Sequence, residues 1–300
     1  MTVPAPQPGL RHMASHAETH LPTAHPLLNA HPARMRDYVL GGSDHYPADR
    51  STVRTLMDAA PCYETSIQIN HEHNLLTGDL LATGLGIGQF LDLRPGLPSR
   101  PGYTDTYPRL CSVLHDVTVI HVDTHTPLAG PTRTCTANER HLFVRGDITQ
   151  PLPLLRNLVV QGYIDLRRPV GVLAPDALSW IPDDADVLHL LDRLWDWAPP
   201  GSALALTHAT HDFTPTAQAE ATTACLRAAG LSHHPRTRTE IARLLSLWDL
   251  REPGLVATGH YHRSHPHVHL SGRHSAAYAA IALRPPGRSR TAGHPVQSSA

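Results

Sequence analysis

From Gln89 onward, short apolar segments typical of buried strands alternate with longer amphipathic segments typical of helices. The predicted helices between strands include Asp183–Trp195, Pro215–Ala228 and Thr239–Leu247. This alternation favours a parallel or mostly parallel sheet with helices on both faces. The last two predicted strands are close in the chain, which predicts an antiparallel pair at the C-terminal edge. The predicted strands are Gln89–Leu93, Val117–Val122, Leu142–Arg145, Val170–Ala174, Ala203–His208, Leu255–Tyr261 and Ala276–Leu283.

The chain before Gln89 is predicted to be helical. Helices are expected at Pro32–Leu40, Ala48–Ala60 and Glu64–Thr83, with Asp44 or Ser43 as the N-cap of the second. Residues 1–30 and 286–300 lack apolar periodicity and are predicted to be disordered tails. One domain is therefore expected over residues 31–285, with a helical cap at 31–85 and a strand–helix core at 86–285.

Charge and composition exclude several classes of function. A net charge of −1 gives no electrostatic case for nucleic acid, and the absence of lysine excludes Schiff-base and P-loop lysines. No apolar run is long enough for a membrane span, and the N-terminus lacks a signal pattern. The four cysteines are widely spaced and predict neither a zinc knuckle nor a disulfide framework. We expect a cytoplasmic protein with no membrane partner; a homodimer is compatible with the sequence.

Histidine is abundant, with 24 residues, which we interpret as compositional bias. His265, His267 and His269 alternate and would share one face of a strand. However, Pro266 interrupts them and no cysteine or acid joins them, so no metal site is expected.

The segment QFLDLRPGLPS, residues 89–99, predicts a buried strand that ends at Asp92 and its neighbour and then enters a tight turn. In doubly wound folds this turn meets a nucleotide-like ligand, and glycines allow its backbone to come close. Here the turn has Gly96 alone, after Arg94 and Pro95. Arg94 is expected to avoid positive φ and Pro95 lacks an N–H, so both should hinder close approach. Asp123 ends the next predicted strand, where an acid is well placed to bind ribose hydroxyls.

The order and spacing of several motifs resemble the actinobacterial S-adenosylmethionine-dependent methyltransferase family, formerly a domain of unknown function. The resemblance implies a Rossmann-like class I methyltransferase: an α/β fold with a seven-stranded, mostly parallel sheet, an antiparallel last strand and a helical N-terminal cap over the cofactor. The motifs are HPARMRDYVLGGSDHYPADR (31–50), GIGQFLDLRPGLPS (86–99), VIHVD (119–123), GDITQP (146–151), RPVGVLAPDALSWIPDD (168–184), PGSALALTHATHD (200–212), RTRTEIARLL (236–245), LREPGLV (250–256) and YAAIALRP (278–285).

The same resemblance implies an S-adenosyl-L-methionine site. Asp123 would bind both ribose hydroxyls, Asp147 the adenine amino group, and Ile148 would pack on the adenine ring. Asp92 and Arg94 would face the amino-acid end of the cofactor, beside Gly96. Alternatives stay open for two of these: Asp92 as a helix cap and Asp147 as an Asx-type turn. Further cofactor-site residues implied by the N-terminal motif and the helix after it are Tyr38, Gly42 and Asn70, although the Gly41–Gly42 pair also suits a plain helix–helix turn.

Three residues at predicted strand ends are candidates for catalysis. His208 and His211 follow the fifth strand and could act as a general base near neutral pH, or simply cap or face solvent. Asp176 follows the fourth strand as a base, a substrate ligand or a turn residue. The leading function is methyl transfer to an unidentified small molecule. One alternative is a degenerate methyltransferase fold that binds a ligand or partner without transfer, because Arg94, Pro95, His71 and Ser179 depart from the family pattern. Another is catalysis that leaves the cofactor unconsumed.

Overall fold

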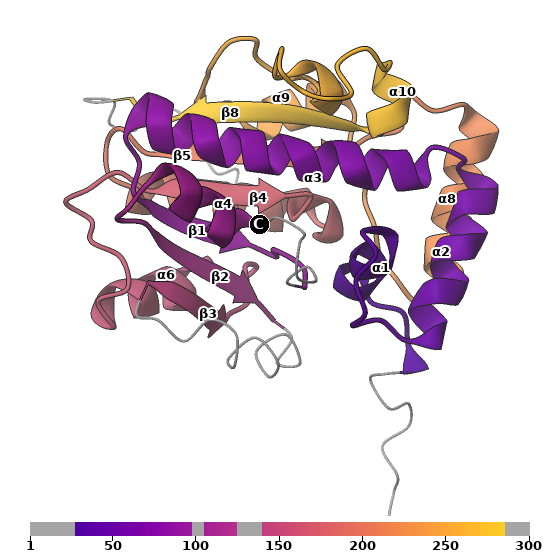
Figure 1. Ribbon diagram of the computed structural model, residues 1–300, viewed down its shortest axis with the longest axis horizontal. Helices are drawn as coiled ribbons and strands as arrows, with labels where there is room; N and C mark the ends of the chain where they lie inside the picture. The colour runs from indigo at the N-terminus through magenta and orange to yellow at the C-terminus, as the bar shows by residue number, and fades with distance from the viewer. Residues whose placement is uncertain (1–27, 98–104, 125–139, 286–300) are drawn as a thin grey trace, which may run out of the picture.

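A single sheet organises the chain, and the computed structural model describes residues 28–97, 105–124 and 140–285 (Figure 1). Apart from residues 28–30, the predicted tails lie outside these ranges. The strand order is β3-β2-β1-β4-β5-β8-β6, and β7 also pairs with β8. The strands are β1 (Gln89–Leu93), β2 (Thr118–Asp123), β3 (His141–Arg145), β4 (Gly171–Pro175), β5 (Ala203–Ala209), β6 (Asp249–Leu250), β7 (Val256–Ala257) and β8 (Ala277–Leu283).

Strands β1 to β5 pair in parallel, whereas β8 runs antiparallel to β5, β6 and β7. This confirms the predicted mostly parallel α/β sheet and the antiparallel pairing of its last two predicted strands. Two details were wrong. The sheet has eight strands because the predicted strand Leu255–Tyr261 is reduced to β7, and β6 precedes it across a turn at Pro253 and Gly254. As a result β8 lies inside the sheet and not at its edge.

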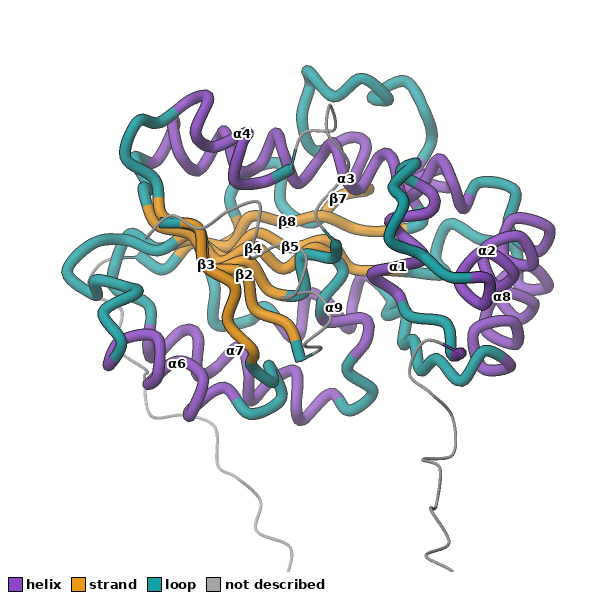
Figure 2. Tube along the Cα trace, turned by 60° about the horizontal axis from the view of Figure 1, so that its bottom comes forward, coloured by secondary structure: helices purple, strands orange, loops and turns teal. Residues whose placement is uncertain are grey.

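Helices cover both faces of the sheet, as Figure 2 shows. One face carries α3 (Tyr63–Asp79) and α4 (Thr106–Val113), packed on the side chains of Phe90, Val119 and Ile281. The other face carries α6 (Pro151–Val160), α7 (Asp184–Trp197) and α9 (Arg238–Leu244), packed on Leu91, Ile120 and Leu204. Because side chains alternate along a strand, neighbouring residues of β1 serve opposite halves of the core.

A third group of helices lies beyond the carboxyl ends of the strands (Figure 1). It consists of α1 (Pro32–Val39), α2 (Pro47–Ala59) and α8 (Thr216–Ala228), with a shared core that includes Met35, Val53, Leu56 and Leu226. These helices face the edge of the sheet where a ligand is expected. Among the described helices, none combines the length and the apolar character that crossing a membrane requires.

The predicted capping of α2 by Asp44 or Ser43 was wrong. The N-cap is Tyr46, and the buried Asp49 carboxylate accepts a hydrogen bond from its backbone N–H at 2.8 Å. Asp49 is also bound by the backbone N–H of His31 and by Nε of Arg34, each at 2.8 Å. A buried acid inside the first turn therefore ties the start of α2 to the start of α1.

Candidate functional site

A cavity of about 1400 Å³, the space at its mouth included, lies at the carboxyl ends of the parallel strands. Arg94 follows β1, Asp123 ends β2 and Asp176 follows β4, and all three line it. The opposite wall includes Tyr63 of α3 and Leu226 of α8. Strand order reverses between β1 and β4, which is where doubly wound sheets bind ligands. The volume exceeds the range of about 300–1,000 Å³ typical of one small ligand, so two small molecules can share it.

Three residues that line this cavity hold the left-handed backbone conformation. Arg94 and Asp176 each have a φ of 55°, and Ala276 has a φ of 47°. Among the described residues, no other non-glycine residue has a positive φ. Each such residue costs about 1–2 kcal/mol, and strain of this kind concentrates at functional sites.

The expectation that Arg94 would avoid positive φ was therefore wrong. Its backbone N–H donates to the Val122 carbonyl at 2.9 Å, which fixes the turn against the end of β2. Gly96 follows at a φ of 86° and also lines the cavity. The turn thus bends as a glycine would allow, at the expense of strain at Arg94.

The side chain of Arg94 brings a cation to the cavity wall. Its guanidinium lies over the Trp180 ring, 5.8 Å from the centroid. Burial lowers the pKa of Arg94, while the carboxylates of Asp123, Asp176 and Asp147 oppose that shift. An anionic ligand group would meet a partly desolvated arginine at this point.

Asn70 of α3 offers the cavity an unsatisfied acceptor. Its Nδ2 donates to the carbonyls of Ser66 at 2.8 Å and Ser275 at 3.1 Å, which sets the orientation of the amide. Its Oδ1 is buried and has no hydrogen-bond partner among the described residues. Such an atom is costly unless a ligand donates to it. With Asp123 and Arg94, it forms a donor set complementary to the ammonium, ribose hydroxyls and carboxylate of S-adenosylmethionine.

Asp92 does not line this cavity. Its carboxylate is buried, with Oδ2 3.0 Å from Nδ1 of His121, whose Nε2 lies 3.0 Å from Nε2 of His141. Burial lowers the pKa of His141 to about 3, the charge of His121 adds to the shift, and the ring stacks on Tyr107 of α4. The expected contact of Asp92 with the cofactor finds no support in this position, because its carboxylate belongs to a buried chain of imidazoles under α4.

Four other predicted cofactor residues also lie outside the cavity as the described residues define it. Asp147 forms the alternative Asx-type turn, accepting from N and Oγ1 of Thr149 at 2.9 and 2.8 Å, and Ile148 is buried in the core. Tyr38 packs on the core of α1, α2 and α8. At Gly42 a Cβ atom would overlap the Asp37 carboxylate, so this glycine is explained by contact with Asp37.

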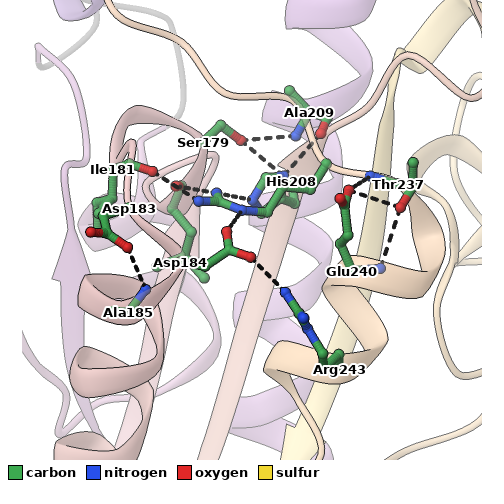
Figure 3. Close-up of polar contacts among 12 residues, drawn as sticks. Ser179, Ile181, Asp183, Asp184, Ala185, His208, Ala209, Thr237, Glu240 and Arg243 are labelled. Atoms are coloured by element: carbon green, nitrogen blue, oxygen red, sulfur yellow. Dashed lines mark hydrogen bonds and ion pairs between the residues drawn. The ribbon is translucent and has the colours of Figure 1, made fainter. Parts of the chain in front are cut away.

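His208 is likewise removed from the cavity, and Figure 3 shows the contacts that enclose it. Its Nε2 lies 3.1 Å from Nη1 of Arg236, and a guanidinium can only donate, so the ring proton is on Nδ1. Nδ1 lies 2.9 Å from the Ala209 carbonyl and 3.1 Å from Oγ of Ser179. Burial lowers the pKa of His208 to about 4. This ring is neutral and fully engaged, so its predicted role as a base toward a ligand lacks geometric support.

His211 and Asp176 do line the cavity, together with His233, which the sequence analysis did not identify. Oδ1 of Asp176 accepts from the Ser179 hydroxyl and from the Ala209 N–H, and its Oδ2 lies 3.7 Å from Nε2 of His233. Burial alone would raise the pKa of Asp176, but the facing His233 imidazole and the Ser179 hydroxyl hold it below its usual value. The structure therefore joins an acid and an imidazole at the end of β4.

The alternating histidines of the C-terminal region serve the fold. His265 is buried and its Nε2 contacts the Ile69 carbonyl at 3.0 Å. No group of three or more metal-binding side chains comes together within the described ranges.

Comparison with known proteins agrees with this arrangement. The family model described as S-adenosyl methyltransferase matches residues 18–285, and no curated protein matches the chain. A solved DUF574 family protein from Streptomyces avermitilis MA-4680 is 26% identical with a TM-score of 0.79, over 86% of this chain and 98% of that one. A provisionally assigned methyltransferase from Thermobifida fusca YX is 27% identical with a TM-score of 0.78, over 86% and 96%. The chain belongs to the S-adenosyl methyltransferase family and is an S-adenosylmethionine-dependent methyltransferase.

Proposed function

We propose that this methyltransferase transfers the methyl group of S-adenosylmethionine to a small molecule bound in the cavity at the ends of β1, β2, β4 and β5. The observation that carries the proposal is the convergence of the buried, unpartnered Oδ1 of Asn70 with the Asp123 carboxylate and the Arg94 guanidinium. These three groups suit one cofactor with an ammonium, two ribose hydroxyls and a carboxylate.

Each of the three groups has a separate role in this proposal. Asp123 accepts hydrogen bonds from both ribose hydroxyls, and Oδ1 of Asn70 accepts from the ammonium. Arg94 binds the carboxylate, and Gly96 lets the turn approach without a side chain in the way. When bound, the cofactor supplies an electrophilic methyl group on a positively charged sulfur. The apolar walls around Trp180 and Leu226 exclude water and hold the acceptor in line with that group.

The departures of this chain from the family motifs are compatible with cofactor binding. His71 stands where the family has arginine, and its Nδ1 lies 2.9 Å from Nη2 of Arg36, which belongs to α1. Nη1 of the same arginine contacts the Pro95 carbonyl at 3.4 Å. An arginine from a different element thus supports the cofactor turn.

Calorimetric titration with S-adenosylhomocysteine, the demethylated product, tests the proposal. The wild type should bind, and Asp123→Asn should weaken binding by roughly 10- to 100-fold, the effect of losing charged hydrogen bonds worth about 1.5–3 kcal/mol. Asp186→Asn, the same change at an exposed position of α7, is the matched control and should bind as the wild type does. Absent binding to the wild type, or equal binding by Asp123→Asn, would contradict the proposal.

Three further expectations stay predictions of the sequence: a cytoplasmic location, a homodimer, and the domain limits at residues 31, 86 and 285.

A further inference from the structure

We propose that His233, backed by Asp176, takes the proton from a hydroxyl group of the acceptor, and that the acceptor is therefore an apolar small molecule methylated on oxygen. This inference rests on the proposed function, because it assigns the acceptor half of the same cavity. His233 belongs to the segment between α8 and α9, and no sequence motif identified it.

Asp176 is held so that only one carboxylate oxygen remains for a partner. Its backbone N–H donates to the carbonyl and to Oγ1 of Thr207, at 3.1 and 3.0 Å, which stabilises its left-handed conformation. Its Oδ1 is occupied by the Ser179 hydroxyl and the Ala209 N–H. Oδ2 is left to face His233 across 3.7 Å. The carboxylate is thus aimed at this imidazole by four contacts from β5 and the turn after β4.

The His233 ring is fixed from two directions. It lies against Trp180, with ring centroids 4.5 Å apart. Its chain neighbours are pinned as well: the N–H of His234 donates to the Ser179 carbonyl at 2.7 Å, and that of Arg236 donates to the Ala209 carbonyl at 3.0 Å. The side chain is only 14% exposed. Positioned catalytic groups need this kind of support from their surroundings.

The other titratable groups of the cavity wall are less suited to the task. His211 has no carboxylate within 4.0 Å among the described residues, and burial lowers its pKa. Asp212, its neighbour, is committed through Oδ2 to the N–H of Arg238 and the hydroxyl of Tyr278. Burial raises the pKa of Tyr63, with the charge of Asp176 adding to the shift, so this phenol keeps its proton. Tyr63 can donate a hydrogen bond to the acceptor but cannot serve as the base.

A base of this kind matters most for a hydroxyl acceptor. A neutral hydroxyl is a weak nucleophile and becomes effective as a base removes its proton, whereas a neutral amine attacks with its own lone pair. In the step, the acceptor O–H bond breaks and an N–H bond forms on the His233 ring. The freed electron pair on oxygen forms the bond to the methyl carbon as the carbon–sulfur bond breaks, with that bond's pair left on sulfur. The Asp176 carboxylate balances the imidazolium, which later releases its proton to water.

The experiment uses 4-nitrophenol as a coloured hydroxyl probe with protein saturated in S-adenosylhomocysteine. Below the pKa of the free probe, the bound probe should absorb as phenolate, with a phenolate-to-phenol ratio about tenfold above that in water, equivalent to one pKa unit. Asp176→Asn, which tolerates the left-handed conformation, and His233→Phe, which keeps a ring against Trp180, should lose this shift. His234→Ala is the matched control, because the neighbouring histidine does not line the cavity; it should keep the shift.

Calorimetry with S-adenosylhomocysteine alone separates the two proposals. If the wild type does not bind it, the proposed cofactor site fails. If the wild type and both variants bind it within about threefold of each other, which is under 1 kcal/mol, the variants are folded and the probe result decides. A probe that does not bind, that ionises as in water, or that ionises equally in Asp176→Asn and His233→Phe would overturn the inference.

Discussion

Nη1 of Arg236 donates to Nε2 of His208 across 3.1 Å, in a part of the protein with almost no access to water. The same guanidinium donates to the carbonyls of Leu178 and Ile181 and pairs with Asp184 at 2.8 Å. Through Ser179, His208 connects to Asp176. An arginine that touches no ligand thus organises the turn that carries one wall of the cavity.

This relationship makes stability depend on pH. His208 has a pKa of about 4 in the folded protein, against 6.5 for an ordinary histidine. Between these values the unfolded chain binds a proton that the folded chain excludes, so stability present above about pH 6.5 is lost as pH falls toward about 4, by up to ~3 kcal/mol. In urea unfolding at about pH 7.5 and about pH 4.5, His208→Gln should lose about 2–3 kcal/mol less than the wild type. Equal losses in the two proteins would show that another group carries the effect.

Arg94 separates backbone strain from ligand binding. Arg94→Ala and Arg94→Gly both remove the guanidinium, so both should weaken binding of S-adenosylhomocysteine by roughly tenfold or more, the value of one charged hydrogen bond. Only glycine relieves the φ of 55°, so Arg94→Gly should exceed Arg94→Ala in unfolding free energy by about 1 kcal/mol. Calorimetry and urea unfolding measure the two effects. If both variants bind as tightly as the wild type, Arg94 does not contact the cofactor.

Asp92 should affect stability more than binding. Asp92→Asn replaces a buried carboxylate that pairs with His121 at 3.0 Å, and should cost about 2–3 kcal/mol of unfolding free energy. Its affinity for S-adenosylhomocysteine should change less than that of Asp123→Asn, measured under the same conditions. The reverse order of the two affinities would restore Asp92 as a cofactor ligand.

Gly42 offers a steric test. A methyl group at this position would collide with the Asp37 carboxylate, so Gly42→Ala should cost about 1–3 kcal/mol, as overpacking does. In an Asp37→Ser background the same change should cost less, and a double-mutant cycle by urea unfolding measures the difference. Additive effects would mean that the collision is relieved elsewhere.

The sheet was predictable because its strands are bounded by residues with clear local preferences. The span of β1 was predicted without error, and those of β2, β3, β4, β5 and β8 within one residue at either end. The strand before β8 was not predictable in the same way. The segment around Val256 has the composition of a strand, but Pro253 and Gly254 turn the chain and leave two short pieces, each held only by pairing with β8.

The site was harder to predict, for reasons that differ between residues. Arg94 was misjudged because local preference forbids what a hydrogen bond to Val122 and the packing on Trp180 enforce. His233 carries no local signal: it is one of 24 histidines, in a segment without periodicity, and acquires a partner only when α8 and α9 bring it to Asp176. Asp92 looked like a cofactor ligand because the imidazoles beside it come from β2 and β3, which the turn motif does not include.

Tyr63, Ile67, Asn70 and Asn74 all line the cavity and recur at the helical period along one stripe of α3. A change of acceptor preference can therefore arise by replacing exposed letters on a single helix, while the sheet and its strained turns stay as they are. Ile67 and Asn74 carry no assigned chemistry, so a combinatorial library at these two positions is the most economical route to new acceptors. The architecture makes substrate scope an evolvable property, separable from the methyl donor.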